Sequence, residues 1–218
     1  MIGRLIASCV ILTWIFWIPG ASAQEIAGYV ARLQGSASEV VGDVGMPLAV
    51  GSPVHRQGIV ETGPEGRAEL VFLDASRLTL GAGAQVEIDE LVYDARPDSR
   101  RREQALRVVA GTFRFVSGAI GKQVPAAVAV WTPVATIGIR GTEFFGGPLA
   151  SGMPPGELHY GFMILGGAIS VDTPQGSVLL DEPNEGTFLP MEGGVAPTPP
   201  ATWSQESIDE AVASIAFR

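Results

Sequence analysis

The chain has 218 residues, of which 46% are apolar and 17% charged, which is the composition of a globular protein of one or two domains. Its 28 glycines and 16 prolines predict many tight turns and argue against a helical bundle. The formal net charge of −9 argues against nucleic-acid binding, because affinity for phosphates comes mainly from cations. A single Cys excludes a disulfide framework and a cysteine-rich metal site.

Residues 1–23 have the pattern of a secretory signal peptide. Arg4 precedes an apolar run at residues 5–18, and small residues follow at 21–23. The run is shorter than the roughly 20 residues that span a bilayer, which disfavours an uncleaved membrane anchor. We therefore expect cleavage after residue 23, no transmembrane span afterwards and a periplasmic location. Secretion or association with the outer surface is the alternative.

The rest of the chain alternates in hydrophobicity with a period of two, which is typical of half-buried strands. Ala68, Leu70 and Phe72 share one face of a strand predicted at residues 67–72. The same alternation recurs at residues 77–80, 86–89, 113–115, 128–130, 137–139 and 169–171. Turn residues separate these segments at intervals of about eight to twelve residues, so we predict an all-β body.

A weak internal repeat favours a short β-solenoid. Residues 109–116 and 165–171 each combine a glycine opening with an alternating strand, and a Thr-Pro pair follows each of them, at Thr132 and at Thr173. Stacked copies of such a unit would bury one continuous core. A β-sandwich or a barrel is the alternative.

We expect a β domain at residues 24–190, then a Pro/Gly linker at 191–203 and a helix at 204–218. Ser207 followed by Glu210 fits a capping box. Ile208, Val212 and Ile215 then recur at helical spacing. A helix this short is marginal alone, so we expect it to dock on the β body or on a partner.

The search for chemistry finds no catalytic, metal or cofactor site. His55 and His159 are more than a hundred residues apart, so we interpret both as ordinary surface histidines. No G-x-S-x-G motif is present. We therefore predict that the chain is not an enzyme and needs no cofactor.

Three clusters of charged residues are interpreted as solvent-exposed and not as functional sites. Glu87 and Asp89 project from one face of a strand, which suits the wet side of a sheet better than a glycosidase pair. Residues 181–186 offer carboxylate oxygens without the spacing of a calcium loop. The basic run at residues 100–102 is interpreted as an exposed hairpin tip.

The densest motif is W-T-P-V-A-T-I-G-I-R-G-T-E-F at residues 131–144. It follows G-I-V-E-T-G at 58–63, D-A-S-R-L-T-L at 74–80 and L-R-V-V-A-G-T-F-R at 106–114. In this order the motifs resemble the FecR domain family, over roughly residues 26–190. Ala75 stands where the family usually has Gly, which is expected to alter the turn type.

The resemblance implies a periplasmic, β-solenoid-like module used for protein interaction or sensing. A cytoplasmic sigma-factor-binding segment, as found in family regulators, is not expected here. The positions that match the family motifs, with a structural or an interaction role, are Asp74, Ser76, Gly111, Phe113, Arg114, Thr132, Pro133, Thr136, Gly138, Arg140, Gly141 and Thr142.

Most of these residue types have a structural interpretation. Thr132 and Pro133 would form a corner, and Gly138 and Gly141 would permit tight packing or a positive φ. We expect the Arg140 fork to hold a carboxylate or backbone carbonyls. The alternative makes Arg140 an anchor for a partner peptide or an anionic glycan.

The sequence therefore predicts a non-catalytic envelope module with a protein partner and no nucleic-acid partner. The alternative is a carbohydrate-binding module that uses Trp131, Tyr93 or Tyr160 as stacking platforms. A third hypothesis, a cryptic glycosidase, would depend on Glu87 and Asp89.

Overall fold

The structure, a computed structural model, describes residues 25–93, 102–123 and 127–218, and the predicted signal peptide lies outside them. Sixteen strands form one sheet. The strands are β1 (Ile26–Gln34), β2 (Ala37–Val41), β3 (Val44–Pro47), β4 (Pro53–His55), β5 (Gly58–Thr62), β6 (Arg67–Phe72), β7 (Arg77–Leu80), β8 (Gln85–Tyr93), β9 (Arg102–Ala110), β10 (Phe113–Val116), β11 (Val128–Trp131), β12 (Thr136–Leu149), β13 (His159–Thr173), β14 (Gly176–Leu180), β15 (Glu185–Pro190) and β16 (Ala201–Thr202). The described helices are α1 (Ala119–Gln123) and α2 (Gln205–Ile215).

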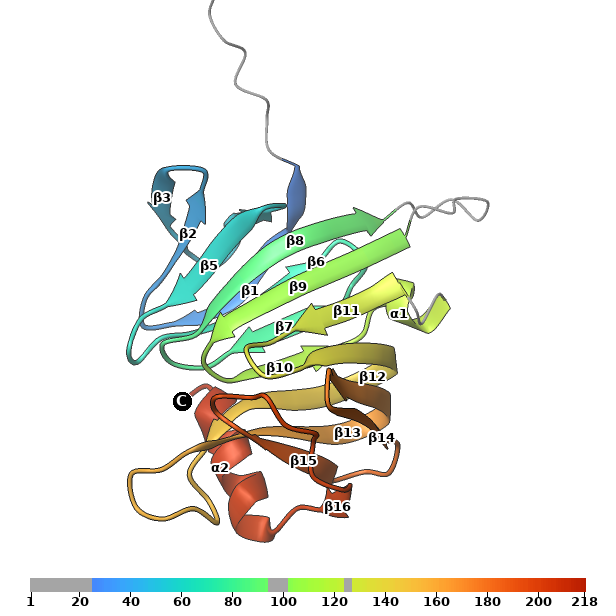
Figure 1. The fold of residues 1–218 in the computed structure, drawn as a ribbon. Coiled ribbons are helices and arrows are strands. Elements are labelled where there is room, and N and C mark those ends of the chain that lie inside the picture. The colour runs from blue at the N-terminus through green and yellow to red at the C-terminus, as the bar shows by residue number, and fades with distance from the viewer. Residues whose placement is uncertain (1–24, 94–101, 124–126) are drawn as a thin grey trace, which may run out of the picture.

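The sheet curls so that its two halves face each other (Figure 1). Layer 1 follows the order β3-β2-β5-β8-β9-β11 and ends on the first half of β12. Layer 2 starts on the second half of β12 and continues β10-β7-β6-β1-β4. The long strand β13 pairs with β12 along both halves and also carries β14 and β15. One strand pair therefore joins the two layers.

The main core fills the space between the layers. Leu70, Leu78 and Phe115 of layer 2 are fully buried, as are Val86 and Leu106 of layer 1. Along each strand, such buried residues alternate with more exposed ones. The period of two in the sequence therefore identifies the face of each strand that is buried. The all-β prediction is confirmed.

A bulge lets β12 pass from one layer to the other. The pairing of β12 with β13 shifts register between Arg140 and Glu143, next to Gly141 with φ +61°. Opposite stands Gly167 with φ +89°, where a Cβ would lie 2.5 Å from the Gly141 carbonyl oxygen and 2.8 Å from the Thr142 Cα. Only glycine fits such a close approach at a positive φ.

The stacked rungs of a solenoid are not confirmed. Fourteen of the fifteen strand pairings are antiparallel, and β9 with β11 is the parallel one among the described strands. Rungs of a solenoid would instead pair in parallel from one repeat to the next. The alternative of a sandwich or a barrel fits in part, because the curled sheet encloses one core but stays open.

The ladder of the two layers ends at two short strands. β3 hydrogen-bonds only to β2 and finishes at Pro47, and β4 hydrogen-bonds only to β1 and begins at Pro53. All four residues of β3 are exposed.

The C-terminal helix α2 docks on the outer face of layer 2, as expected for a helix of this length. Ala211 and Ser207 are its buried residues, and Ile208 and Ile215 pack beside Phe145. Val212, predicted on the docking face, is exposed because Ala211 takes that position. No helix in the described part of the chain is long and apolar enough to cross a membrane.

The N-cap of α2 is Ser204 and not Ser207. The Ser204 side chain accepts a hydrogen bond from the Ser207 N–H at 3.2 Å, and the two hydroxyls lie 2.9 Å apart. Both serines precede acidic residues, so the sequence pattern fits two starts one turn apart. The earlier start prevails because Ser207 is buried against Ser151, whose hydroxyl donates to it at 3.0 Å.

The segment predicted as a linker, residues 191–203, lies along β15. The Thr198 N–H donates to the Phe188 carbonyl at 3.1 Å, and the Phe188 N–H donates to the Thr198 hydroxyl at 2.9 Å. Ala201–Thr202 adds the short strand β16, and Trp203 is buried under α2. The segment is thus a strap that carries the chain from the sheet to the helix.

We predict that Gly167→Ala destabilises the fold more than Gly156→Ala. Both glycines have a φ near +90°, but a Cβ at Gly156 would meet nothing within 4 Å. The backbone cost of about 1–2 kcal/mol is therefore shared, and the close approach at the bulge should add about 1–3 kcal/mol at Gly167. Urea unfolding measures both, and equal midpoints for the two variants would contradict the role of the bulge.

Candidate functional site

The D-x-S motif forms a buried turn between β6 and β7. Asp74 Oδ1 accepts hydrogen bonds from the Ser76 N–H at 3.0 Å and from the Ser76 hydroxyl at 2.6 Å. Ala75 between them adopts φ +64°, so the turn keeps the conformation that a glycine would favour. Asp74 Oδ2 accepts from the Ile120 N–H at 3.3 Å, and the Asp74 carbonyl accepts from the Ala119 N–H at 2.8 Å. The turn thereby holds the start of α1.

The same buried polar seam continues to the R-G-T part of the motif. Ser117, just before α1, accepts a hydrogen bond from the Thr142 N–H at 2.9 Å, and its own N–H donates to the Thr142 carbonyl at 2.9 Å. The Thr142 hydroxyl donates to the Ala168 carbonyl at 2.6 Å across the bulge. Gln104 of β9 donates to the Ser76 hydroxyl at 2.8 Å, which ties layer 1 to the turn. Sequence motifs far apart along the chain therefore meet in one interior network.

Other motif positions are distributed over both layers. Phe113 is buried in the core, and Thr132 closes the β11–β12 corner by donating to the Ala135 carbonyl at 2.8 Å. Pro133 is exposed in that corner. The remaining positions are Gly111 with φ +83° before β10, Gly141 with φ +61° in the bulge, Arg114 on the outer face of layer 2, and Thr136, Gly138 and Arg140 on the outer face of layer 1.

The expected partner of Arg140 is not found. The side chain is exposed and makes no hydrogen bond or ion pair with another residue that the structure describes. The guanidinium points away from the sheet because β12 alternates Ile137 and Ile139 into the core.

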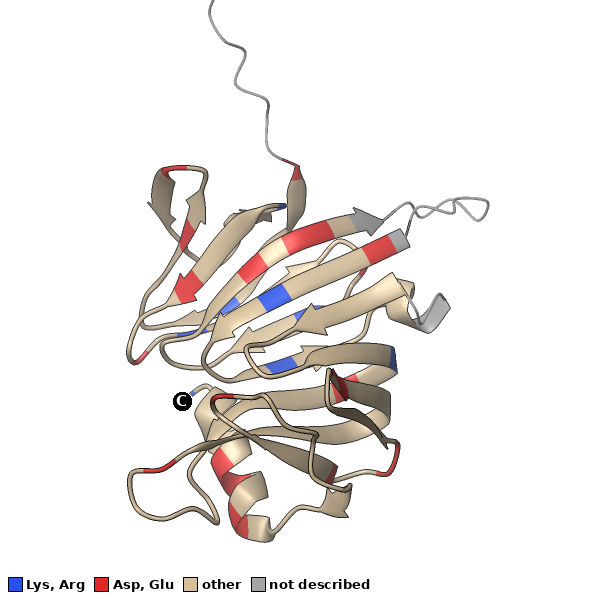
Figure 2. Ribbon diagram, in the orientation of Figure 1, with Lys and Arg blue, Asp and Glu red and all other residues tan. Residues whose placement is uncertain are grey.

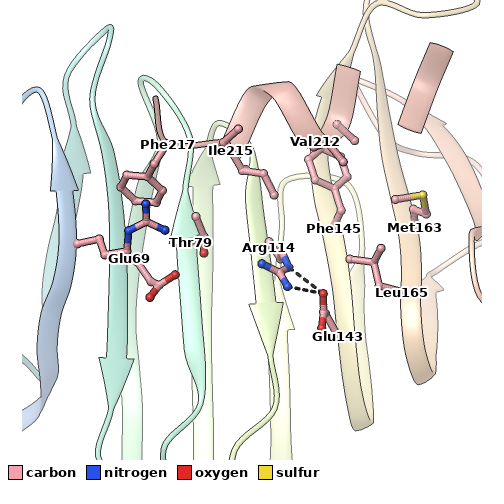
Figure 3. A pocket seen from close by; sticks show the side chains of 13 residues that line it. Glu69, Thr79, Arg114, Glu143, Phe145, Met163, Leu165, Val212, Ile215 and Phe217 are labelled. Carbon is pink, nitrogen blue, oxygen red and sulfur yellow. Dashed lines mark hydrogen bonds and ion pairs between the residues drawn. The ribbon is translucent and has the colours of Figure 1, made fainter. Parts of the chain in front are cut away.

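A groove lies beside α2, on the outer face of layer 2 (Figure 3). Its floor is one row of side chains that the strand registers align across six neighbouring strands. The row consists of Arg32, Glu69, Thr79, Arg114, Phe145 and Met163. We call it the α2 groove; its volume is about 350 Å³.

The α2 groove combines an apolar wall with charges of both signs. Arg114 donates from Nε at 2.9 Å and from Nη2 at 2.5 Å to Glu143 Oε1. Val212 and Phe217 close the groove from the helix side, and the Arg32 guanidinium lies 4.1 Å from the centre of the Phe217 ring. Val212 keeps 52% of its surface exposed. Such a groove can receive an apolar side chain while its floor makes charged contacts with the rest of the ligand.

The position of α2 depends on Glu210. Its two carboxylate oxygens accept hydrogen bonds from the Ala150 and Ser151 N–H groups, each at 2.8 Å. Burial alone would raise the pKa of Glu210, but these N–H groups, the Ser151 hydroxyl and His159 outweigh it and lower the pKa. Burial lowers the pKa of His159, an effect that Glu210 opposes in part.

The surface interpretation fails for His55 and holds for Glu87 and Asp89. His55 is not an ordinary surface residue, because its Nδ1 lies 2.9 Å from the buried Glu39 carboxylate. Glu87 and Asp89 lie on the outer face of layer 1 and share Arg107, at 3.4 and 3.2 Å. The surface interpretation of these two carboxylates agrees with the structure.

Of the three aromatic platforms named for sugar binding, Tyr160 is excluded. It is only 1% exposed and packs on Phe162 in the core, where burial raises the pKa of its phenol. Trp131 lies on the outer face of layer 1, and the side chain of Tyr93 lies outside the described part. Arg100 and Arg101, at the predicted hairpin tip, also lie outside it.

The α2 groove was not found from the sequence. Of its floor, Thr79 and Arg114 belong to the recognised motifs at residues 74–80 and 106–114. Thr79 and Met163 become neighbours of Arg114 and Phe145 through strand register, and no local pattern encodes which strands pair.

The comparisons with known proteins agree with the motifs. Residues 58–152 match the model of the FecR protein family, in the middle of the span over which the resemblance was expected. Two similar solved structures are both described as an anti-sigma factor from Parabacteroides distasonis ATCC 8503, with TM-scores of 0.51 and 0.50. Both are 14% identical to this chain and cover 69% of it, so the likeness concerns the fold. The match spans 62% of the length of those chains. Among curated proteins, no match was found.

We predict that Asp74→Ala lowers the free energy of unfolding by about 2–5 kcal/mol. The substitution leaves the buried N–H groups of Ser76 and Ile120 without an acceptor. Asp181→Ala, in an exposed turn, is the matched control and should be nearly neutral. Denaturant unfolding measures both variants. A neutral Asp74→Ala would show that the seam contributes no stability.

We also predict that acid loosens α2 in two steps. His159 has a lowered pKa, so its contribution to the stability of the folded state weakens as the pH falls below about 6.5. Glu210 also has a lowered pKa, so its contribution to the docking of α2 is complete above about pH 4.3, the ordinary pKa of a Glu. That contribution is lost as the pH falls through the pKa of Glu210 in the folded state.

The fluorescence of the buried Trp203 reports this loosening in a chain that lacks residues 1–23, with Trp14 and Trp17, and carries Trp131→Phe. Glu210→Gln should abolish the step at lower pH and keep the step at higher pH. An unchanged acid profile in Glu210→Gln would refute the assignment.

Proposed function

We propose, from the premise that residues 58–152 of this chain form a FecR domain, that the chain is a regulatory, non-catalytic module that senses through a protein partner in the cell envelope. The family match supports the regulatory class. The fold shared with two chains described as an anti-sigma factor points in the same direction.

The observation that carries the proposal is the α2 groove. It is open to solvent, its wall is apolar, and Arg32, Arg114, Glu69 and Glu143 supply charges of both signs. Protein interfaces concentrate binding energy where an apolar side chain enters a pocket with a polar rim. A partner segment with an aliphatic or aromatic anchor flanked by charged residues fits this groove.

The Arg114–Glu143 pair gives the groove its specificity. Both groups are partly exposed, so each keeps the capacity to bond a partner while remaining paired in the free protein. A partner that places a carboxylate near Arg114, or a cation near Glu143, extends the existing pair and leaves no unpaired charge. Wrong partners would leave one desolvated charge unmatched, which disfavours them.

The proposed location is the periplasm. It is supported by the signal-peptide pattern of residues 1–23, with its single cation, apolar run and small residues before the cleavage point.

The proposal predicts that Val212→Asp disables the regulatory output. Val212 lines the groove at 52% exposure, and Leu73, outside it, is 50% exposed, so Leu73→Asp is a matched control. Each variant is expressed in a strain that lacks the native copy, and the transcripts are compared with those of the deletion and of the wild type. Val212→Asp should reproduce the deletion, and Leu73→Asp should reproduce the wild type.

A photo-crosslinking residue at position 212, with the same residue at 73 as control, identifies the partner in the intact envelope. The proposal requires a product that forms at 212 only. A deletion strain whose transcripts equal those of the wild type, or crosslinks that are identical at both positions, would overturn it.

A further inference from the structure

The outer face of layer 1 carries a second hollow, opposite the layer that holds the α2 groove. Ala129 of β11, Gly138 of β12 and Ser170 of β13 stand side by side in register, and Leu179 of β14 continues the row. These small side chains form the floor of a trough of about 510 Å³, which is the size of a site for a small ligand. We call it the β12 trough.

One end of the β12 trough has a cation available for binding. Arg140 lies on its rim, is exposed, and pairs with no other described residue. The guanidinium fork is suited to hold a carboxylate through two parallel hydrogen bonds. Glu103 lies two strands away on the same face, roughly 10 Å by strand spacing, where water and salt screen its charge.

The other end is lined by the hydroxyl groups of Thr136 and Ser170, and Trp131 lies just beyond this lining. Thr136, two positions before Gly138, pairs with Trp131 on one side and with Asp172 on the other. Asp172 accepts hydrogen bonds from the Ser170 hydroxyl at 2.7 Å and from the Ser177 hydroxyl. The Ser170 oxygen, which lines the trough, therefore keeps its lone pairs available to a ligand.

Trp131 is held in place by its neighbours. The Arg107 guanidinium lies 5.5 Å from the ring centre, and Arg107 is itself bound to Glu87 and Asp89. A ring fixed in this way is a platform for the apolar face of a sugar. Arg140 and Trp131 are separated by roughly 13 Å along the strands, a span that a short oligosaccharide fills.

We infer that the β12 trough binds an acidic oligosaccharide, with a uronic acid carboxylate on Arg140 and a sugar ring near Trp131. The ligand class follows from the position of the trough in the middle of the sheet. The backbone groups of β11, β12 and β13 are paired with neighbouring strands there, so a peptide gains no main-chain hydrogen bonds. Recognition therefore depends on side chains, which suits a ligand with dense peripheral hydroxyl groups and a carboxylate.

The charge of the chain further restricts the class of ligand that the β12 trough can bind. The net charge is −9, and β8 carries three acidic residues beside Glu61 of the neighbouring strand β5 (Figure 2). This field disfavours polyanions such as nucleic acids, whereas one carboxylate can be satisfied by one arginine. The ligand should therefore carry few charges.

Titration calorimetry with aldotriouronic acid, a trisaccharide with a single uronic acid carboxylate, tests the inference on the full mature chain. The wild type should bind it, and Arg140→Gln should weaken binding roughly tenfold or more, because a charge-assisted pair is lost. Arg77→Gln is the control, since Arg77 is an exposed arginine on layer 2, away from the trough, with Glu69 at 4.0 Å. Its affinity for aldotriouronic acid should equal that of the wild type. The melting temperature of Arg140→Gln should also equal that of the wild type, because no described contact is removed.

Two further ligands separate the alternatives. Maltotriose, a neutral trisaccharide, should bind more weakly than aldotriouronic acid, and hexaglutamate, an acidic peptide, should not bind at the trough. The inference is overturned if aldotriouronic acid does not bind, if Arg140→Gln binds it as well as the wild type, if maltotriose binds equally, or if only hexaglutamate depends on Arg140. These results are independent of the transcripts and crosslinks at Val212, so either proposal can fail alone.

Discussion

The bulge between Arg140 and Glu143 is the constraint on which the rest of the structure depends. It lets one strand serve as the last strand of layer 1 and the first strand of layer 2, so that both layers close over a single core. Gly167 makes room for the crossing, and Thr142 fixes it with hydrogen bonds to β13 and to the segment before α1. Without it, β12 would continue in one layer and leave the core open on that side.

The two candidate surfaces follow from the same crossing. Arg140, before the bulge, faces outward from layer 1, and Glu143, after it, faces outward from layer 2. A sugar acid and a protein partner would thus occupy opposite outer faces of the molecule while touching residues three positions apart on one strand. The α2 helix covers part of one face only, which explains why that groove has an apolar wall and the β12 trough does not.

The strands were predictable from the sequence because alternation is local. Residues 67–72 and 77–80 were expected as strands and are β6 and β7. The buried D-x-S turn and the positive φ of Gly141 also follow from residue type and motif. The pairing of strands did not follow, since the weak internal repeat favoured a parallel stack, whereas most described strands pair antiparallel. The floor of the α2 groove depends on that pairing, and for this reason local patterns missed it. For Arg140, the expected carboxylate or carbonyl partner is not found among the described residues, and the alternative of a ligand anchor stays a hypothesis.

An open sheet carries an additional hazard, since its last strands offer bare amide and carbonyl groups to any other copy of the chain. Repeated edge-to-edge addition of this kind leads to fibrils. The two short end strands carry Pro47 and Pro53, and a proline has no amide hydrogen to give to an incoming strand. Pro47 and Pro53 therefore each remove one donor from the two ends of the ladder, which weakens the addition of another strand there.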